Sequence, residues 1–261
     1  DILYKDAVQQ KQIDMEYFIR TFENTVRRCW DKPALDEYRT SSETYGQLAA
    51  DIEAIHIYFK AAGLKPGDKI AINARSSASW IKTFMAAVSG GYVAVELFNG
   101  YTARDAQALV DHSDSCLLFT EKGIYKDMDF SAMPQLRGVI DLRSGELLDS
   151  RGDFAKIYAQ RDQLFVQAHP TGMIPDDVHY PERGMDELCA IMYTSGSTGF
   201  PKGVMLSVRN FSANIDMIPS HCPYHEGDSY VSVLPYAHIF GLTFDAIAPL
   251  CFGMHLVVLY V

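Results

Sequence analysis

Short apolar runs alternate with amphipathic stretches between residues 68 and 142, and this order limits the possible folds more than any other feature of the sequence. The apolar runs cover residues 69–73, 92–95, 115–120 and 138–142. Apolar residues at helical spacing lie between them, at residues 77–89 and 102–111. Parallel strands need a crossover connection, which is usually a helix, so the order predicts a parallel sheet with helices on its faces. We therefore expect an α/β fold with a doubly wound core from about residue 68 onward.

A further helix is predicted before this core, over residues 45–62. Apolar residues at helical spacing run along it and end at Ala62. Thr44 and Gln47 have the spacing of a capping box, in which each side chain accepts a hydrogen bond from the other residue's backbone N–H. Gly63 supplies the stop signal. The segment is therefore expected to form an amphipathic helix with one face in the core.

The charge of the chain excludes one class of ligand. Its 261 residues contain 23 Lys and Arg against 33 Asp and Glu, which gives a formal net charge of -10. A protein that binds duplex nucleic acid needs a basic surface to displace counterions, so nucleic acid is not an expected partner. The hydrophobic content of 48% and charged content of 21% are typical of a folded chain with a sizeable core. An anionic ligand must then be held by a local device, such as one lysine or a row of backbone N–H groups.

The cysteines and the first residues indicate a cytoplasmic protein. The five cysteines are far apart, form no C-x-x-C pair and lie mostly in apolar runs, which is typical of reduced core thiols. The chain starts with a charged, aromatic stretch rather than a signal peptide. No transmembrane helix is predicted, although residues 229–261 are strongly apolar. Five residues interrupt their apolar runs: Pro235, His238, Asp245, Pro249 and Gly253.

The last six residues, 256–261, have the pattern of an apolar strand with no polar turn after it. A strand of this composition is expected to be covered on both faces. Each large side chain left in water would forfeit about 1.5 to 3 kcal/mol. We therefore expect a further segment of a longer protein to supply part of that cover.

The chemically informative segment is LCAIMYTSGSTGFPKGVML at residues 188–206. Two apolar runs flank a stretch of small, hydroxylic and glycine residues that is followed by one lysine. Glycines let successive N–H groups turn toward one point, hydroxyls add donors, and the lysine supplies a full positive charge. The segment therefore suits a polyphosphate.

This segment does not match the two best-known phosphate-binding motifs. A Walker loop would need glycine in place of Pro201 and Ser or Thr in place of Gly203, and no G-x-G-x-x-G is present. The apolar runs on both sides predict a loop between two strands, with the next helix starting near Ser207. The alternative reading is a flexible Gly/Ser connection, but the ordered series of features favours phosphate binding.

Several segments together resemble the adenylate-forming superfamily, which includes acyl-CoA synthetases, amino-acid adenylation domains and beetle luciferases. YTSGSTGFPKGVML resembles its phosphate loop, and LPYAHIFG at residues 234–241 resembles the motif that follows that loop. Residues 44–48 resemble its early helix start, residues 90–95 its second motif, and residues 111–113 a His-Ser pair of long-chain acyl-CoA synthetases. The resemblance covers residues 17–261.

The resemblance implies two intertwined α/β subdomains with mainly parallel sheets flanked by helices. The first would comprise residues 66–225, including the phosphate loop at 193–203, and the second residues 15–65 together with 226–261. Members of the family carry an adenine motif, a ribose aspartate, a hinge and a catalytic lysine further along the chain. This chain is therefore expected to be the truncated N-terminal part of such an enzyme, to need the C-terminal half as a partner and to be inactive alone.

The resemblance also implies a reaction in two halves. A carboxylate, expected to be a fatty acid that a membrane surface could deliver, attacks the α-phosphate of ATP bound to Mg²⁺. The resulting acyl-adenylate then reacts with a thiol, usually coenzyme A, and AMP leaves. His238 would be catalytic near the carboxylate, with Phe240 and Gly241 lining the acyl tunnel, and Thr194 would also contact Mg²⁺. By resemblance the phosphates would be held by Thr194, Ser195, Gly196, Ser197, Thr198, Gly199 and Lys202.

Other polar residues favour plainer interpretations. His221 and His225 could suggest a metal site, but Pro223 breaks the helix that would place them on one face. His112 is explained by its favourable interaction with the carbonyl end of a helix. Asp245 is similar to the aspartate with which amino-acid adenylation domains hold the substrate amine, but its spacing to the following residues does not fit, so a structural role is expected.

Two alternatives stay open for the chain as a whole. One is an amino-acid or aryl-acid adenylation domain that feeds a carrier protein. The other is a noncatalytic nucleotide-binding module that keeps the phosphate loop. For His238 the alternative is a histidine that is simply satisfied within the core.

Overall fold

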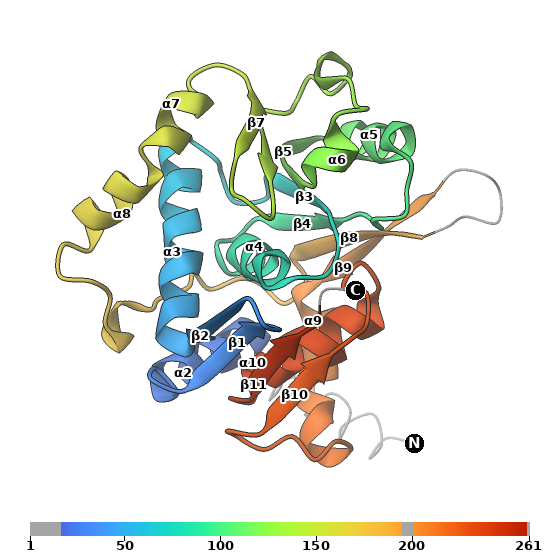
Figure 1. Cartoon of the computed structure of the whole chain (residues 1–261). Helices are drawn as coiled ribbons and strands as arrows, with labels where there is room; N and C mark the ends of the chain where they lie inside the picture. Colours follow the sequence, from blue (N-terminus) through green and yellow to red (C-terminus); the bar gives the residue numbers. More distant parts are fainter. Residues whose placement is uncertain (1–16, 195–200, 260–261) are drawn as a thin grey trace.

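A computed structural model describes residues 17–194 and 201–259, which form two sheets and the helices around them (Figure 1). The larger sheet has seven strands in the order β7-β6-β5-β3-β4-β8-β9. Its five inner strands are parallel, and the two edge strands pair antiparallel to their neighbours. The strands are β3 (Lys69–Asn73), β4 (Val93–Glu96), β5 (Ser115–Thr120), β6 (Gly138–Asp141), β7 (Leu147–Ser150), β8 (Leu188–Thr194) and β9 (Lys202–Ser207).

The smaller sheet joins the two ends of the described chain. Its four strands lie in the order β10-β11-β1-β2, and β11 pairs in parallel with both β1 and β10. Its strands are β1 (Pro33–Glu37), β2 (Ser41–Thr44), β10 (Ser229–Ser232) and β11 (His255–Val258). The mixed α/β fold with two sheets flanked by helices is therefore confirmed. The strands of each sheet fall within the two predicted subdomains, whose boundaries stay a prediction.

The helices cover both faces of the larger sheet. Figure 1 shows α4 between the two sheets and α5 on the opposite side of the larger one. The α-helices are α2 (Phe18–Arg28), α3 (Tyr45–Ala61), α4 (Ala78–Ser89), α5 (Ala103–His112), α6 (Lys122–Tyr125), α7 (Phe154–Ala159), α8 (Arg161–Ala168), α9 (Val208–Met217) and α10 (Ala248–Cys251). Shorter turns of 3-10 helix are η1 (Phe130–Ala132), η2 (Pro175–Asp177) and η3 (Ile218–Ser220), and η4 (Gly241–Ile247) is a π-helix.

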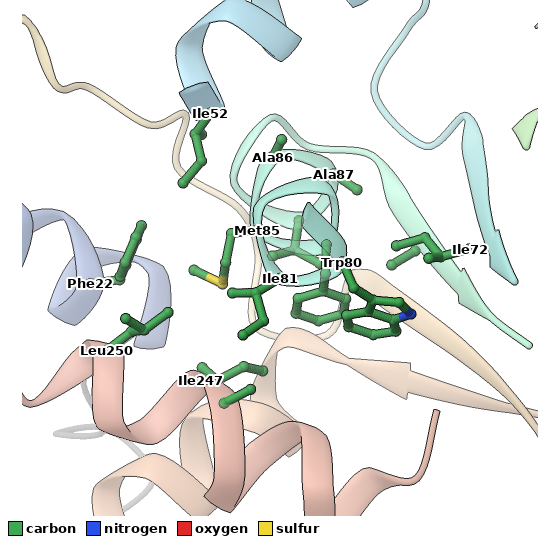
Figure 2. Packing of buried hydrophobic residues seen from close by; sticks show 14 of the residues in the cluster. Phe22, Ile52, Ile72, Trp80, Ile81, Met85, Ala86, Ala87, Ile247 and Leu250 are labelled. Atoms are coloured by element: carbon green, nitrogen blue, oxygen red, sulfur yellow. The ribbon is translucent and has the colours of Figure 1, made fainter. Parts of the chain in front are cut away.

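One hydrophobic core links the two sheets through α4. Trp80 and Phe84 of this helix are fully buried and stack with ring centroids 5.7 Å apart. Figure 2 shows Trp80 and Ile81 in one cluster with Ile247 and Leu250, which precede the smaller sheet's β11. Because so much apolar surface is shared across this cluster, the two sheets are held in a fixed relation.

Most elements predicted from the sequence are confirmed. The helix α3 begins after Thr44, and both hydrogen bonds of the capping box are present. Residues 143–187 contain two short helices, α7 and α8. The last strand ends at Val258, and residues 260–261 lie outside the described part of the chain.

Candidate functional site

The end of the β8–β9 hairpin is the first wall of the candidate site. Thr194 ends β8 and lies directly opposite Lys202, which begins β9, and the Thr194 hydroxyl donates a weak hydrogen bond to the Lys202 carbonyl at 3.4 Å. Both side chains are exposed. The prediction of a loop between two strands is confirmed, and α9 follows with Ser207 as its N-cap. Five predicted phosphate-binding residues lie outside the described residues: Ser195, Gly196, Ser197, Thr198 and Gly199.

Tyr193, the residue before Thr194 in β8, is held in place by two contacts with distant parts of the chain. The Tyr193 hydroxyl lies 2.7 Å from Nδ1 of His112, at the end of α5. The Tyr101 hydroxyl also donates to the Tyr193 carbonyl at 3.4 Å. Burial raises the pKa of the Tyr193 hydroxyl, so it stays neutral and can donate or accept in this contact. His112 was expected only to interact with its own helix end, and the structure adds this tyrosine contact, which links residues far apart in sequence.

The segment between β10 and η4 is the second wall, and it carries His238. The imidazole is exposed, and its Nδ1 accepts a hydrogen bond from the Phe240 N–H at 3.3 Å. The His238 N–H donates to the Pro235 carbonyl at 3.2 Å. Because Nδ1 accepts, the neutral ring carries its proton on Nε2, where it can be donated to a ligand. Of the two readings of His238, the exposed position excludes a histidine hidden in the core.

Gly241 sets the shape of this second wall. A Cβ added at this position would lie 2.3 Å from the Pro235 carbonyl oxygen, far inside van der Waals contact. Only glycine therefore lets η4 begin so close to the turn that precedes it. The preceding residue, Phe240, is 55% exposed, and its ring stacks on that of Phe244 with centroids 4.8 Å apart. Single π-helical turns often occur at functional sites.

A cavity of about 770 Å³ lies between the two walls. It brings together Thr194, His238, Phe240 and Gly241, whereas Lys202 does not line it. Most of the remaining lining is apolar or aromatic. These further residues are Phe98, Tyr101, Met192, Tyr193, Val204, Leu206, Leu234, Pro235, Ala237 and Ile239.

The sequence reasoning missed Phe98 and Tyr101 as lining residues. Both follow the carboxyl end of β4, and their rings meet edge to face with centroids 6.0 Å apart. Ligands of open α/β sheets commonly bind at the carboxyl ends of the parallel strands. Applying that rule to the residues just after Val93–Glu96 would have indicated both side chains.

Glu96, the last residue of β4, is a second residue that the sequence reasoning missed. It is 0% exposed, and neither carboxyl oxygen has a hydrogen-bond partner among the described residues. It pairs in register with Met192, which lines the cavity. Burial raises the pKa of this carboxyl well above its usual value, so the neutral acid is favoured.

Neither a cluster of metal ligands nor a membrane-spanning helix is present among the described residues. In residues 17–194 and 201–259, no group of three or more His, Cys, Asp or Glu side chains could hold a metal ion, and His221 and His225 therefore belong to no such group. None of the helices in those two ranges combines the length and hydropathy of a membrane span.

The sequence of this chain is similar to those of known proteins. Residues 22–260 match a protein family described as AMP-binding enzyme. The chain is 28% identical over 232 residues to an oxalate–CoA ligase of Arabidopsis thaliana, covering 88% of this chain and 42% of that protein. It is also 28% identical over 251 residues to long-chain-fatty-acid–CoA ligase 1 of Saccharomyces cerevisiae, covering 87% and 35%. The chain thus spans well under half the length of these relatives.

The fold is similar to that of solved structures as well. The N-terminal domain of FACL13 from Mycobacterium tuberculosis superimposes with a TM-score of 0.75 at 21% identity. The match covers 94% of this chain and 57% of that one. At this level of identity the comparison supports the fold alone.

Proposed function

Since the chain belongs to the family of AMP-binding enzymes, we propose that it is the N-terminal part of an ATP-dependent acid:CoA ligase. The protein would activate a carboxylic acid as acyl-AMP and transfer the acyl group to coenzyme A. The observation that carries this proposal is the cavity with Thr194 on one wall and His238 on the other. Such a cavity can hold an acid next to the phosphates of a nucleotide.

The hairpin wall would bind the phosphates. Among the residues that the structure describes, the Thr194 hydroxyl makes one weak contact, so it can turn toward a phosphate oxygen or toward Mg²⁺ that arrives with ATP. Among the described residues no carboxylate forms an ion pair with the Lys202 ammonium, which leaves its charge for the β- and γ-phosphates. Ser195, Gly196, Ser197, Thr198 and Gly199 are proposed to complete the phosphate site. Mg²⁺ would neutralise part of the phosphate charge.

The second wall would hold the acid. A carboxylate oxygen attacks the α-phosphorus of ATP, the bond to the bridging oxygen breaks, and pyrophosphate leaves. The Nε2–H of His238 can donate to the carboxylate and orient it for this attack, which is mainly a positioning effect. Phe240 and Gly241 are proposed to line the path of the acyl chain.

The cavity supports an acid with an apolar tail. Phe98, Leu234 and Ile239 are among its lining residues, and few polar groups face it apart from those at the two walls. An apolar lining gains free energy from a buried hydrocarbon but none from a very small polar acid. We therefore propose a medium-chain or long-chain fatty acid, although one relative is described as an oxalate–CoA ligase.

An amino-acid adenylation function has less support from the site. Asp245, the aspartate that could hold a substrate amine, is 2% exposed and already accepts four hydrogen bonds from within the protein. It is therefore not free to bind an amine. An aryl acid or a noncatalytic nucleotide-binding role stays an alternative to be tested.

We further propose that the chain alone does not turn over. It covers 42% and 35% of two ligases, and coenzyme A and the adenine ring would need residues beyond those matched here. A cytoplasmic location also stays a proposal, supported by five free cysteines.

The experiment is an ATP–pyrophosphate exchange assay with the longest protein that contains this chain. Decanoate, palmitate, benzoate, oxalate and an amino-acid mixture are offered in turn. Exchange that depends on a fatty acid is expected, and exchange only with an amino acid or with none would contradict the proposal. Robust pyrophosphate release by the 261-residue chain itself would contradict its proposed inactivity.

A further inference from the structure

Asp245 lies inside η4 and holds the strand that leads to His238. Its Oδ2 accepts hydrogen bonds from the Val233 N–H at 2.7 Å, the Leu234 N–H at 2.8 Å and the Ser232 hydroxyl at 2.8 Å. Its Oδ1 accepts from the Tyr230 hydroxyl at 2.9 Å. One carboxylate thus takes four donors from a stretch of five residues.

These contacts join the two ends of the segment that forms the second wall. The chain leaves β10 after Ser232, passes His238 and enters η4 at Gly241, so Asp245 ties the end of η4 back to the start of the segment. Without the carboxylate, the N–H groups of Val233 and Leu234 would lose these partners at the point where the strand ends. A buried carboxylate needs such donors, because burial of an unpaired charge is strongly unfavourable.

A second set of bonds ties the same segment to the larger sheet. The Ser232 hydroxyl lies 2.6 Å from the Tyr236 hydroxyl, and the Tyr236 N–H donates to the Ser76 hydroxyl at 3.0 Å. The Tyr236 ring packs on Trp80 of α4 with centroids 5.4 Å apart. Asp245 and Ser76 therefore hold the residues just before His238 from both sides.

We propose that Asp245 is a positioning residue, which holds His238 and the acid-binding wall in place without contacting the substrate. The proposal rests on the proposed function, since it assigns Asp245 to the acid side of that same site. The phosphate side depends on a different element, because Thr194 and Lys202 are carried by the β8–β9 hairpin. Removal of the Asp245 carboxylate should therefore weaken binding of the acid and leave binding of the phosphates unchanged.

Two substitutions at this position separate hydrogen bonding from charge. Asp245→Ala removes all four acceptor contacts. Asp245→Asn keeps an oxygen that can accept from Val233 and Leu234, and its NH₂ group can donate to the Tyr230 hydroxyl, so the segment keeps most of its bonds. The matched control is Thr243→Ala, because this buried residue of η4 has a hydroxyl without a partner among the described residues.

The first readout needs no ligand. The His238 ring resonances of the 261-residue chain are followed by NMR and assigned with His238→Gln. Asp245→Ala is expected to shift or broaden them, whereas Asp245→Asn and Thr243→Ala leave them near their wild-type positions. Unchanged His238 resonances in a folded Asp245→Ala variant would overturn the proposal.

The second readout compares two affinities by titration calorimetry, with decanoate and with MgATP as probes. Asp245→Ala is expected to weaken decanoate binding at least about tenfold, because a displaced His238 loses its charge-assisted hydrogen bond to the carboxylate, while MgATP binding changes little. Parallel losses of both affinities would overturn the positioning role and indicate general destabilisation. A wild-type chain that binds no decanoate, but whose His238 responds to Asp245→Ala, would contradict the proposed function and support the positioning role.

Discussion

The two walls of the cavity are built in opposite ways. At the hairpin wall, Thr194 and Lys202 are exposed and share one weak hydrogen bond. At the other wall, Asp245 gathers four donors and Gly241 allows a close backbone approach to Pro235. A wall that binds an anion must leave donors free, whereas a wall that orients a carboxylate must be rigid. Stability should therefore depend more on the second wall than on the exposed Thr194 and Lys202 side chains, whereas ligand binding should depend on both walls.

The largest effect on stability is expected at Glu96, one strand inward from the hairpin wall. Its pKa is raised in the folded state, so its contribution to stability is fully present below about pH 4.3, the usual Glu pKa. That contribution is lost as the pH rises toward the folded pKa, by about 1.4 kcal/mol per pH unit. Glu96→Gln cannot ionise, so its advantage over wild type should grow between pH 5 and 8 in urea unfolding.

The control for this prediction is Met192→Leu, at the residue in register with Glu96, because neither side chain of this substitution ionises and its stability difference from wild type should not change with pH. A constant difference between Glu96→Gln and wild type from pH 5 to 8 would show that Glu96 is already charged in the folded protein.

Gly241→Ala, in the second wall, should clearly lower the free energy of unfolding. The added methyl group would overlap the Pro235 carbonyl oxygen, and overpacking of this kind typically costs about 1 to 3 kcal/mol. Gly123→Ala is the matched control, since nothing lies within 4 Å of its added Cβ. The free energy of unfolding in urea measures both variants. Equal stabilities of the two would mean that the second wall is not rigid.

A smaller effect on stability is expected from substitution of Glu226, which precedes β10 and the second wall. Hydrogen bonds from Lys32 and Arg28, the latter at 2.7 Å, lower the pKa of its carboxyl to about 2. Its contribution to stability is present above about pH 4.3 and is lost as the pH falls toward 2.

Because this carboxylate is partly exposed, its contribution should be below about 1 kcal/mol. The melting temperatures of wild type and Glu226→Gln should therefore differ slightly at pH 6 and converge on acidification. A gap that is the same at pH 3 and pH 6 would contradict the ion-pair assignment.

The sequence predicted the elements whose signals are local. The capping box at Thr44 and Gln47 and the apolar runs of β3, β4 and β5 depend on neighbouring residues only. The β8–β9 hairpin was predicted for the same reason, because two apolar runs flank one short polar stretch. The helix α8 was missed because none of its residues is buried, so it lacks the apolar stripe that reveals a surface helix.

The candidate site was only partly predictable, since its geometry depends on contacts between distant segments. The bond between His112 and Tyr193 joins residues 81 positions apart, and no periodicity reports it. Asp245 was expected to have a structural role, but its four hydrogen-bond partners could not be predicted, because they depend on how η4 turns back toward β10. Glu96 ends an apolar strand, and nothing in the neighbouring sequence indicates that its carboxyl is completely buried.

The central claim is that the hairpin wall binds the phosphates of a nucleotide, and Lys202→Ala tests it most directly. Backbone amide shifts of Thr194 and Lys202 in ¹⁵N-labelled protein are followed as MgATP is added. These amides should shift saturably in wild type, and Lys202→Ala should bind at least about tenfold more weakly, because it loses a charge-assisted bond. Its free energy of unfolding should stay within about 0.5 kcal/mol, as for other surface substitutions. Equal MgATP affinity of the two proteins, or shifts confined to residues far from the hairpin, would contradict the claim.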